Sequence, residues 1–339
     1  MFGSSLIHTG PDGELMSWAQ YEGEVTRAPN KLLLDVLRDL GWEINMDFYN
    51  AFGTTYYRDD ATIVEDDDFL TNYDYTYALY VHGDGNFISQ SGTLESQGDF
   101  SDTLRLVGEN NVLDVTGNLI ATGDASTALY LYGEDNWIFV RGDILAQGEG
   151  SVGIYVPDPM NRLTLSGTTI SADTALHVTA SNLVLIESGC QIDGDLVAEG
   201  NRSAMQFGYL FDEEGNLVER DSDFYFSFDD DIVGNWLGYL GAGELSLNGH
   251  ADFESLTIQQ LGTLKGDGTI HGPVINQGAV APGNSIGTLT IDGDYTQETA
   301  AVLEIEAGEG SADLLRVTGT AVLQGGTLVL LPSGYLTSG

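Results

Sequence analysis

The chain has 339 residues, and 11 Lys and Arg residues against 52 Asp and Glu residues give it a formal net charge of −41. Such an acidic surface repels nucleic acid and anionic membranes, which argues against both as partners. The single cysteine excludes an intramolecular disulfide framework. The sequence contains no apolar run of about 18 residues, the length that would predict a membrane-spanning helix.

The N-terminal segment, 1–60, does not repeat and contains one predicted helix. Asn30 is placed to cap a helix that runs through the apolar positions Leu33 and Val36, and Gly41 is placed to end it. We expect this short helical segment to cover the first edge of the β-structure that follows.

Residues 1–42 also resemble the tail of a metzincin-like zinc metalloprotease domain, in which a Met-containing turn precedes a closing helix. Met16 and the sequence Leu40-Gly41-Trp42 carry this likeness, which implies either a relic or the truncated end of a protease. The zinc-binding H-E-x-x-H motif is missing from the sequence, and His8 alone cannot hold a catalytic zinc ion.

Residues 50–76 are rich in Tyr and Asp, with an acidic run at Asp66, Asp67 and Asp68. Carboxylates of this kind are the ligands that Ca²⁺ prefers, although a calcium site needs six or more oxygens in a set geometry. A solvated loop is the alternative interpretation, and the sequence predicts neither another metal site nor any other cofactor.

From about Ala78 to Gly167 the sequence repeats with a period of about 25 residues, which is in the range of known repeat architectures. Fixed positions of the period are occupied by Asn, by Gly and by an aliphatic residue. These columns are Asn86, Asn111, Asn136 and Asn161; Gly92, Gly117, Gly142 and Gly167; Gly98, Gly123 and Gly148; and Leu79, Leu104, Leu129 and Ile154. A fixed period of this length with alternating apolar residues is typical of a solenoid of short strands.

We therefore predict an all-β fold, a right-handed parallel β-helix whose coils stack on one another. The glycines are expected to supply positive φ angles at the corners. The Asn column either forms a hydrogen-bonded ladder at a corner or simply tolerates turn geometry. The interior is then a filled core, in which Cys190 is expected to lie, and function belongs on the outer faces or in interrupting loops.

Two groups of aromatic residues are the candidate binding sites. Tyr80, Tyr130 and Tyr155 recur at one outward position of the repeat, where they either contact a sugar or a protein partner or merely cover the sheet. Residues 201–240 interrupt the repeat with an expected loop or hairpin near 207–232. Its aromatic residues either form a binding loop or belong to an ordinary coil: Tyr209, Phe211, Phe224, Tyr225 and Phe226.

The C-terminal part, residues 262–339, carries a family likeness. The segment from Gly278 to Leu289, GAVAPGNSIGTL, and the later DLLRVTG from Asp313 resemble the end of an autotransporter passenger domain of type V secretion. The resemblance implies that residues 61–261 form the passenger β-helix and that 262–339 form its autochaperone-like end. It also implies an excised piece of a longer precursor.

The same resemblance implies a location at the Gram-negative cell surface or outside the cell. An outer-membrane β-barrel translocator of the same precursor would be one partner, and a host-cell surface protein or glycan another, with self-association also open. The implied role is a rigid adhesive scaffold of the kind found among virulence factors.

Enzyme activity is the competing hypothesis, and the sequence favours a chain without a catalytic residue. The Gly283–Gly287 segment matches the G-x-S-x-G motif of serine hydrolases, but no helix is predicted after it. A β-helix that acts on glycans, or the stalk of a metalloprotease whose zinc-binding helix lies outside this chain, remains the alternative.

Overall fold

The computed structural model describes residues 25–26, 53–211 and 217–332. The fold is an all-β parallel β-solenoid of about 11 turns. No helix occurs in these described ranges, and so none that is long and apolar enough to cross a membrane. The expected helix at 30–41, together with His8, Met16 and Trp42, lies outside the described residues. The chain divides into two compact units, residues 1–161 with 171–174 and residues 162–170 with 175–339.

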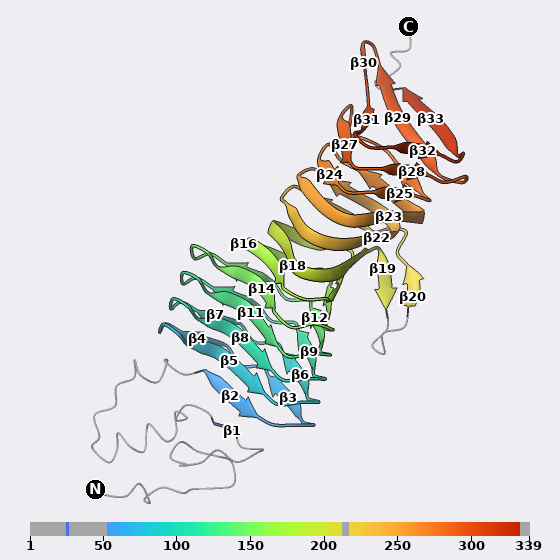
Figure 1. Cartoon of the computed structure of the whole chain (residues 1–339). Helices are drawn as coiled ribbons and strands as arrows, with labels where there is room; N and C mark the ends of the chain where they lie inside the picture. The colour runs from blue at the N-terminus through green and yellow to red at the C-terminus, as the bar shows by residue number, and fades with distance from the viewer. Residues whose placement is uncertain (1–24, 27–52, 212–216, 333–339) are drawn as a thin grey trace, which may run out of the picture. The chain divides into compact units, whose positions relative to one another are not determined.

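In the first unit each coil contributes three strands, and each strand pairs in parallel with the equivalent strand of the next coil (Figure 1). The first sheet contains β2 (Thr54–Tyr57), β5 (Tyr77–His82), β8 (Asp102–Val107), β11 (Thr127–Tyr132) and β14 (Val152–Val156). The second contains β3 (Thr62–Glu65), β6 (Phe87–Gln90), β9 (Val112–Val115) and β12 (Trp137–Val140). The third contains β4 (Phe69–Thr71), β7 (Leu94–Ser96), β10 (Leu119–Ala121) and β13 (Ile144–Ala146).

The solenoid begins earlier than its repeat suggests. Strand β2 pairs in register with β5, so that Thr54 lies opposite Leu79, and β1 (Val25–Thr26) pairs antiparallel with β2. Residues 54–57 therefore belong to a coil, although the sequence places them in the non-repeating segment. The repeat is hidden in this coil because Ala61, Asp67 and Tyr73 occupy the positions of Asn86, Gly92 and Gly98 in the next coil.

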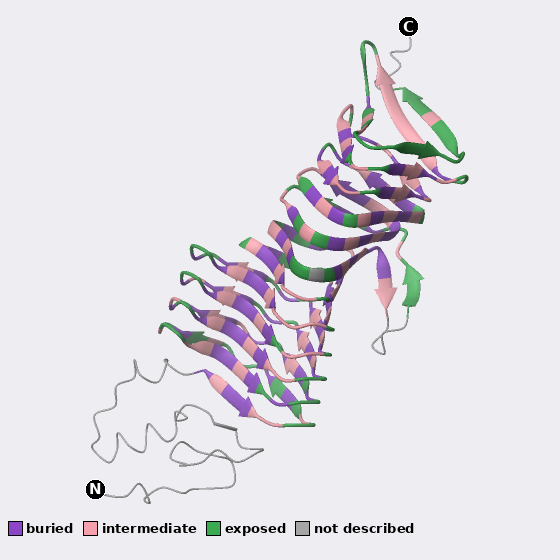
Figure 2. Cartoon of the chain, viewed as in Figure 1, coloured by how far each residue is buried: buried purple, intermediate pink, exposed green. Residues whose placement is uncertain are grey.

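Alternation of side chains builds the core of each coil. Leu79, Leu104, Leu129 and Ile154 form one inward column, and all four are fully buried. Figure 2 shows buried residues alternating with partly or fully exposed ones along the strands. The interior is thus a packed core, as the repeat predicts, because every second residue of a strand points to the same side.

The Asn column is a hydrogen-bonded ladder inside the core. The backbone N–H of Asn86 donates to Oδ1 of Asn111 at 2.9 Å, and the same contact joins Asn111 to Asn136 and Asn136 to Asn161. All four side chains are at most 2% exposed. The residue before the asparagine, such as Asn110 with a φ of 57°, carries the positive φ angle. The ladder interpretation is therefore confirmed over the turn-tolerance one.

Carboxylates on the outside of the corners form a second kind of ladder that runs the other way. The N–H of Asp84 donates to Oδ1 of Asp59 in the preceding coil, and the N–H of Glu109 donates to Oδ1 of Asp84. In the inner Asn ladder the side chain of the following coil accepts instead. Each corner is therefore hydrogen-bonded to the coil before it and to the coil after it. Some of the many carboxylates of the chain accept backbone N–H groups in this way.

The glycines fill two separate roles, and the expectation that all of them supply positive φ angles is wrong. Gly150 has a φ of 70°, and a Cβ there would meet no atom within 4 Å, so only its backbone angle calls for glycine. Gly117 has no positive φ, but a Cβ there would lie 2.1 Å from the carbonyl oxygen of Gly92 in the preceding coil. Gly92 and Gly142 of the same column are equally close to the preceding coil, so glycine is required there because stacked backbones leave no room for a side chain. Gly167, the last member of the column, has open space and a φ of 61°.

The second unit has the same parallel stacking with longer and less regular strands. Its first strands are β15 (Arg162–Leu165), β16 (Thr169–Val178, of which 171–174 belong to the first unit), β17 (Leu183–Ile186) and β18 (Gln191–Phe207). The hairpin β19 (Tyr209–Phe211) and β20 (Leu217–Arg220) interrupts them. The next are β21 (Tyr225–Phe228), β22 (Ile232–Leu247), β23 (His250–Lys265), β24 (Thr269–His271), β25 (Val274–Asn276) and β26 (Ala279–Val280). The last are β27 (Thr288–Asp292), β28 (Tyr295–Gln297), β29 (Val302–Gly308), β30 (Ser311–Ala312), β31 (Leu314–Val317), β32 (Ala321–Leu323) and β33 (Thr327–Pro332).

Aromatic rings fill the core of the second unit. The rings of Phe207 and Phe226 stack with centroids 6.1 Å apart, and Trp236 is fully buried. Cys190 is 8% exposed and lies in this core as the sequence predicts, where burial raises the pKa of its thiol to about 11.

Candidate binding surfaces

One outer face of the first unit is rich in aromatic residues. We call it the tyrosine face; it is the outside of the β2–β5–β8–β11–β14 sheet. Register pairs Tyr80 with Arg105, Arg105 with Tyr130 and Tyr130 with Tyr155, so the predicted tyrosines share one column with an arginine. All of these side chains are partly exposed. The structure therefore brings the three predicted tyrosines onto one surface.

Sequence reasoning missed the two flanking columns of this face. They contribute Tyr57, Tyr77, His82 and Tyr132, and the rings of Tyr77 and Tyr80 stack with centroids 4.8 Å apart. Tyr132 is 51% exposed. The signal was present for His82 and Tyr132, which lie two positions from Tyr80 and Tyr130 along a strand and point to the same side. Tyr77 lies three positions from Tyr80, because Ala78 and Leu79 between them are both buried.

Arg105 stands at the centre of the tyrosine face. Its guanidinium lies 4.5 Å from the centroid of the Tyr130 ring, and its Nη1 lies 3.3 Å from a carboxylate oxygen of Asp102. Burial raises the pKa of Asp102 to about 6 against the opposing effect of Arg105. Burial also raises the pKa of the Tyr80 and Tyr130 phenols, so both hydroxyls are neutral donors and acceptors at pH 7.

A second aromatic feature, absent from the sequence-based candidates, lies at a corner of the first unit. Tyr75 and Phe100 occupy the same position of successive coils, with rings 5.1 Å apart and 7° from parallel. They are 76% and 55% exposed. Both have positive φ angles, 57° and 55°, a conformation that is uncommon for bulky residues. Their shared position in the repeat was the available signal.

The interrupting segment of the second unit forms the expected hairpin. Tyr209 pairs with Arg220 across β19 and β20, and the guanidinium of Arg162 lies 4.4 Å from the centroid of the Phe211 ring. Tyr209 itself is only 7% exposed. Phe211 is partly exposed, so of these two predicted residues it offers the larger accessible surface.

The other aromatic residues of this segment belong to a coil. Phe224 and Phe226 are 2% and 1% exposed and lie in the core, because β21 stacks in parallel on β22. A ligand cannot reach them while the coil is folded. Tyr225 lies between them on the opposite side of the strand and is 59% exposed. The structure therefore separates Tyr225 from its two neighbours.

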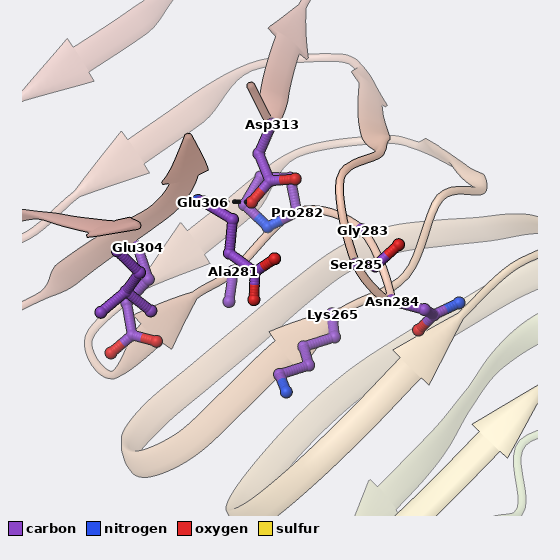
Figure 3. A pocket seen from close by; sticks show the side chains of 10 residues that line it. Lys265, Ala281, Pro282, Gly283, Asn284, Ser285, Glu304, Glu306 and Asp313 are labelled. Atoms are coloured by element: carbon purple, nitrogen blue, oxygen red, sulfur yellow. Dashed lines mark hydrogen bonds between the residues drawn. The ribbon is translucent and has the colours of Figure 1, made fainter. Parts of the chain in front are cut away.

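The G-x-S-x-G segment borders a small depression of about 80 Å³ (Figure 3). Lys265, Glu304 and Glu306 line its other side, and Nζ of Lys265 lies 2.9 Å from a carboxylate oxygen of Glu244. Ser285 lies in a loop between β26 and β27 and not in a strand-to-helix turn. The loop is held by Asp313, whose Oδ1 accepts the N–H of Gly287 at 2.9 Å. The arrangement lacks the context of a hydrolase nucleophile.

Side chains that could ligate a metal ion do not gather in the described part of the chain. No group of three or more His, Cys, Asp or Glu side chains converges there in a way that could hold a metal ion. The Asp66–Asp68 run lies in the corner between β3 and β4, where Oδ1 of Asp68 accepts the N–H of Thr93. This contact gives one of the three carboxylates a capping role.

No family model matches the chain, and neither does any curated protein or solved structure. The fold and the exposed surfaces are therefore the grounds on which a function can be argued.

Proposed function

We propose that this protein is a surface-displayed or secreted scaffold that binds a host-cell glycan or protein through its tyrosine face. In this proposal it is a right-handed β-helical passenger of the autotransporter type. The observation that carries the binding role is the column Tyr80–Arg105–Tyr130–Tyr155 on one sheet of stacked coils.

Composition of the tyrosine face supports this role. Aromatic rings with polar tips give large contact areas and hydrogen bonds, which is why they are enriched in binding interfaces and stack on sugar rings. In a chain of net charge −41, the outward columns of this face contain a single carboxylate, Asp102, which is paired with Arg105. A neutral ligand or protein surface therefore meets little electrostatic repulsion there.

The autotransporter assignment rests on the GAVAPGNSIGTL segment and on a parallel solenoid without disulfides. The solenoid also suits a structural role, because rigid stacked coils hold side chains at fixed spacings along a sheet. Ser285 in the same segment lies in a loop between two strands and not in the strand-to-helix turn of a hydrolase nucleophile, which favours a binding protein over a hydrolase.

The test is binding of the purified protein to host cells and to an array of glycans and matrix proteins. The key variant carries Tyr80→Ala, Tyr130→Ala and Tyr155→Ala. Tyr239→Ala is the matched control, because Tyr239 is a partly exposed tyrosine of the other unit and belongs to neither group of candidate binding residues. Binding that the triple variant loses and the control keeps supports the proposal. Equal binding by the triple variant, or no binding by the parent protein, refutes it.

A hairpin variant separates the two candidate surfaces. Residues 207–232 include the core residues Phe207, Phe224 and Phe226, so only 210–219 should be replaced by a Gly/Ser linker. Loss of binding in this variant, with the triple variant unaffected, would assign adhesion to the hairpin instead.

A further inference from the structure

We propose that the corner formed by Phe100, Ala125, Asp99 and Asp124, here called the Phe100 corner, binds an arginine side chain of a basic protein segment. This site is separate from the tyrosine face and does not depend on the function proposed for it. Elsewhere on the first unit, aromatic rings that lie beside a carboxylate are covered by an arginine of the chain itself.

Apart from the Phe100 corner, the described outer surface of the first unit shows two places where an arginine of the chain lies over a ring and pairs with a neighbouring carboxylate. Arg105 lies over Tyr130 and pairs with Asp102. Arg141 lies 5.2 Å from the centroid of the Phe139 ring and pairs with Asp114 in the preceding coil. The molecule thus contains its own examples of the ligand that an outward ring with a neighbouring carboxylate accepts.

At the Phe100 corner the ring and the carboxylates are present without the cation. Among the described residues, no Lys, Arg or His forms an ion pair with Asp99 or Asp124. One oxygen of each carboxylate is used, because Oδ1 of Asp99 accepts the N–H of Asp124 and Oδ1 of Asp124 accepts the N–H of Glu149. The second oxygens are the acceptors for a guanidinium.

The column of rings stops where the ligand is expected to lie. Tyr75 stacks on Phe100, but the same position holds Ala125 in the next coil and Gly150 in the one after. A Cβ placed on Gly150 would meet no atom within 4 Å. Phe100 therefore ends a stack with open space on the side of the following coils, and a planar group can lie on its ring above Ala125.

Geometry and charge favour arginine over other occupants. A guanidinium is planar, stacks on an aromatic ring and presents a fork of donors to a carboxylate, whereas the lysine ammonium is a compact point charge. The net charge of −41 draws basic proteins to this surface, which raises their rate of encounter. A neutral sugar stacked on Phe100 is the competing outcome that the experiment must separate.

The experiment measures binding of three Gly/Ser peptides of equal length, which carry two arginines, two lysines or two glutamines, to the full chain by calorimetry. Phe100→Asn removes the ring, and asparagine suits the positive φ, as Asn110 shows at another corner. Ala125→Arg supplies the guanidinium from the chain itself. Ser91→Arg adds the same charge at a different, exposed corner and is the matched control.

We expect the arginine peptide to bind about tenfold more tightly than the lysine peptide, and Phe100→Asn to remove this preference. Ala125→Arg should block the arginine peptide, whereas Ser91→Arg and the triple tyrosine variant should keep the preference. Equal binding of the two cationic peptides, or a preference that survives Phe100→Asn, would overturn the proposal in favour of unspecific charge attraction. So would tighter binding of a neutral oligosaccharide that Phe100→Asn abolishes.

Discussion

The backbone N–H and the Nδ2–H of Asn111 both donate to the single Oδ1 of Asn136 in the next coil, at 2.9 and 3.1 Å. Asn111 in turn accepts the equivalent pair of donors from Asn86. Each buried amide therefore satisfies two donors of its neighbour, and the ladder fixes the axial register of successive coils at one corner.

Asn111→Ala breaks this ladder in the middle. The N–H and the amide of Asn86 lose their shared acceptor inside the core, where an unsatisfied polar group costs about 1–3 kcal/mol. We expect the free energy of unfolding in urea to fall by about 2–3 kcal/mol. Asn72→Ala, at an exposed asparagine, should change it by less than about 0.5 kcal/mol. Equal effects of the two changes would show that the ladder contributes no stability.

Gly117→Ala tests the close approach of coils. The new Cβ would lie 2.1 Å from the carbonyl oxygen of Gly92, so the backbones must separate, and we expect a loss of about 3 kcal/mol. Gly150→Ala meets open space and only its φ of 70° opposes the methyl group, at a cost of about 1 kcal/mol. Urea denaturation of both variants decides the order, and a larger loss for Gly150→Ala would contradict this account.

The columns of asparagine and glycine also show why the sequence predicts the solenoid but not the geometry of its corners. A fixed period whose aliphatic column, Leu79 and Leu104 among it, is fully buried leaves few folds available, because only stacked coils bury such a column. The same pattern does not tell a glycine needed for its φ, such as Gly150, from one needed for space, such as Gly117. That distinction depends on atoms of the neighbouring coil, which a single repeat does not contain.

Asp102 should make stability depend on pH. Its pKa is raised from 3.8 to about 6 by burial, so the folded state binds its proton more tightly than the unfolded chain does. The free energy of unfolding should therefore fall as the pH rises from about 4 to about 6, by about 3 kcal/mol for this group. Asp102→Asn removes this loss.

The measurement for Asp102 compares urea midpoints of the parent and of Asp102→Asn across this pH range. The variant should gain stability relative to the parent as the pH rises, although it lacks the ion pair with Arg105. A constant difference between the two proteins would mean that Asp102 titrates normally.

Phe226 and Tyr225 are adjacent in sequence and should respond in opposite ways to truncation. Phe226→Ala removes a ring that stacks on Phe207 and Phe228 in the core, and we expect a loss of about 3–5 kcal/mol. Tyr225→Ala removes an exposed ring and should cost less than about 1 kcal/mol. Thermal unfolding of both variants is sufficient, and a ligand lost by Tyr225→Ala without loss of stability would place binding on this strand.

Cys190 should be unreactive in the folded protein. Burial raises the pKa of its thiol to about 11, and the side chain is 8% exposed, so little thiolate is present or accessible at pH 8. An aromatic disulfide reagent should label it only after urea is added. Rapid labelling of the native protein would show that this part of the second unit opens readily.

The candidate surfaces were harder to predict than the core. Tyr80, Tyr130 and Tyr155 could be predicted as surface residues because outward positions recur with the period of the coil. Phe224 and Phe226 could not be told from Tyr225 in the same way, since their strand lies beside an interruption that breaks the period. The stacked pair Tyr75 and Phe100 lies at a corner, where alternation gives no direction for a side chain.

The two opposed corner ladders have a consequence for how this protein can change its length. Every inner and outer cap joins equivalent positions of successive coils, so the contacts of Asp84 with Asp59 and with Glu109 would survive the gain or loss of one whole coil elsewhere. Duplication or deletion of one repeat therefore alters the reach of the stack by one strand spacing, about 4.8 Å, without a new kind of contact. The length of the stack can therefore change in steps of one coil, through the gain or loss of single repeats in the gene.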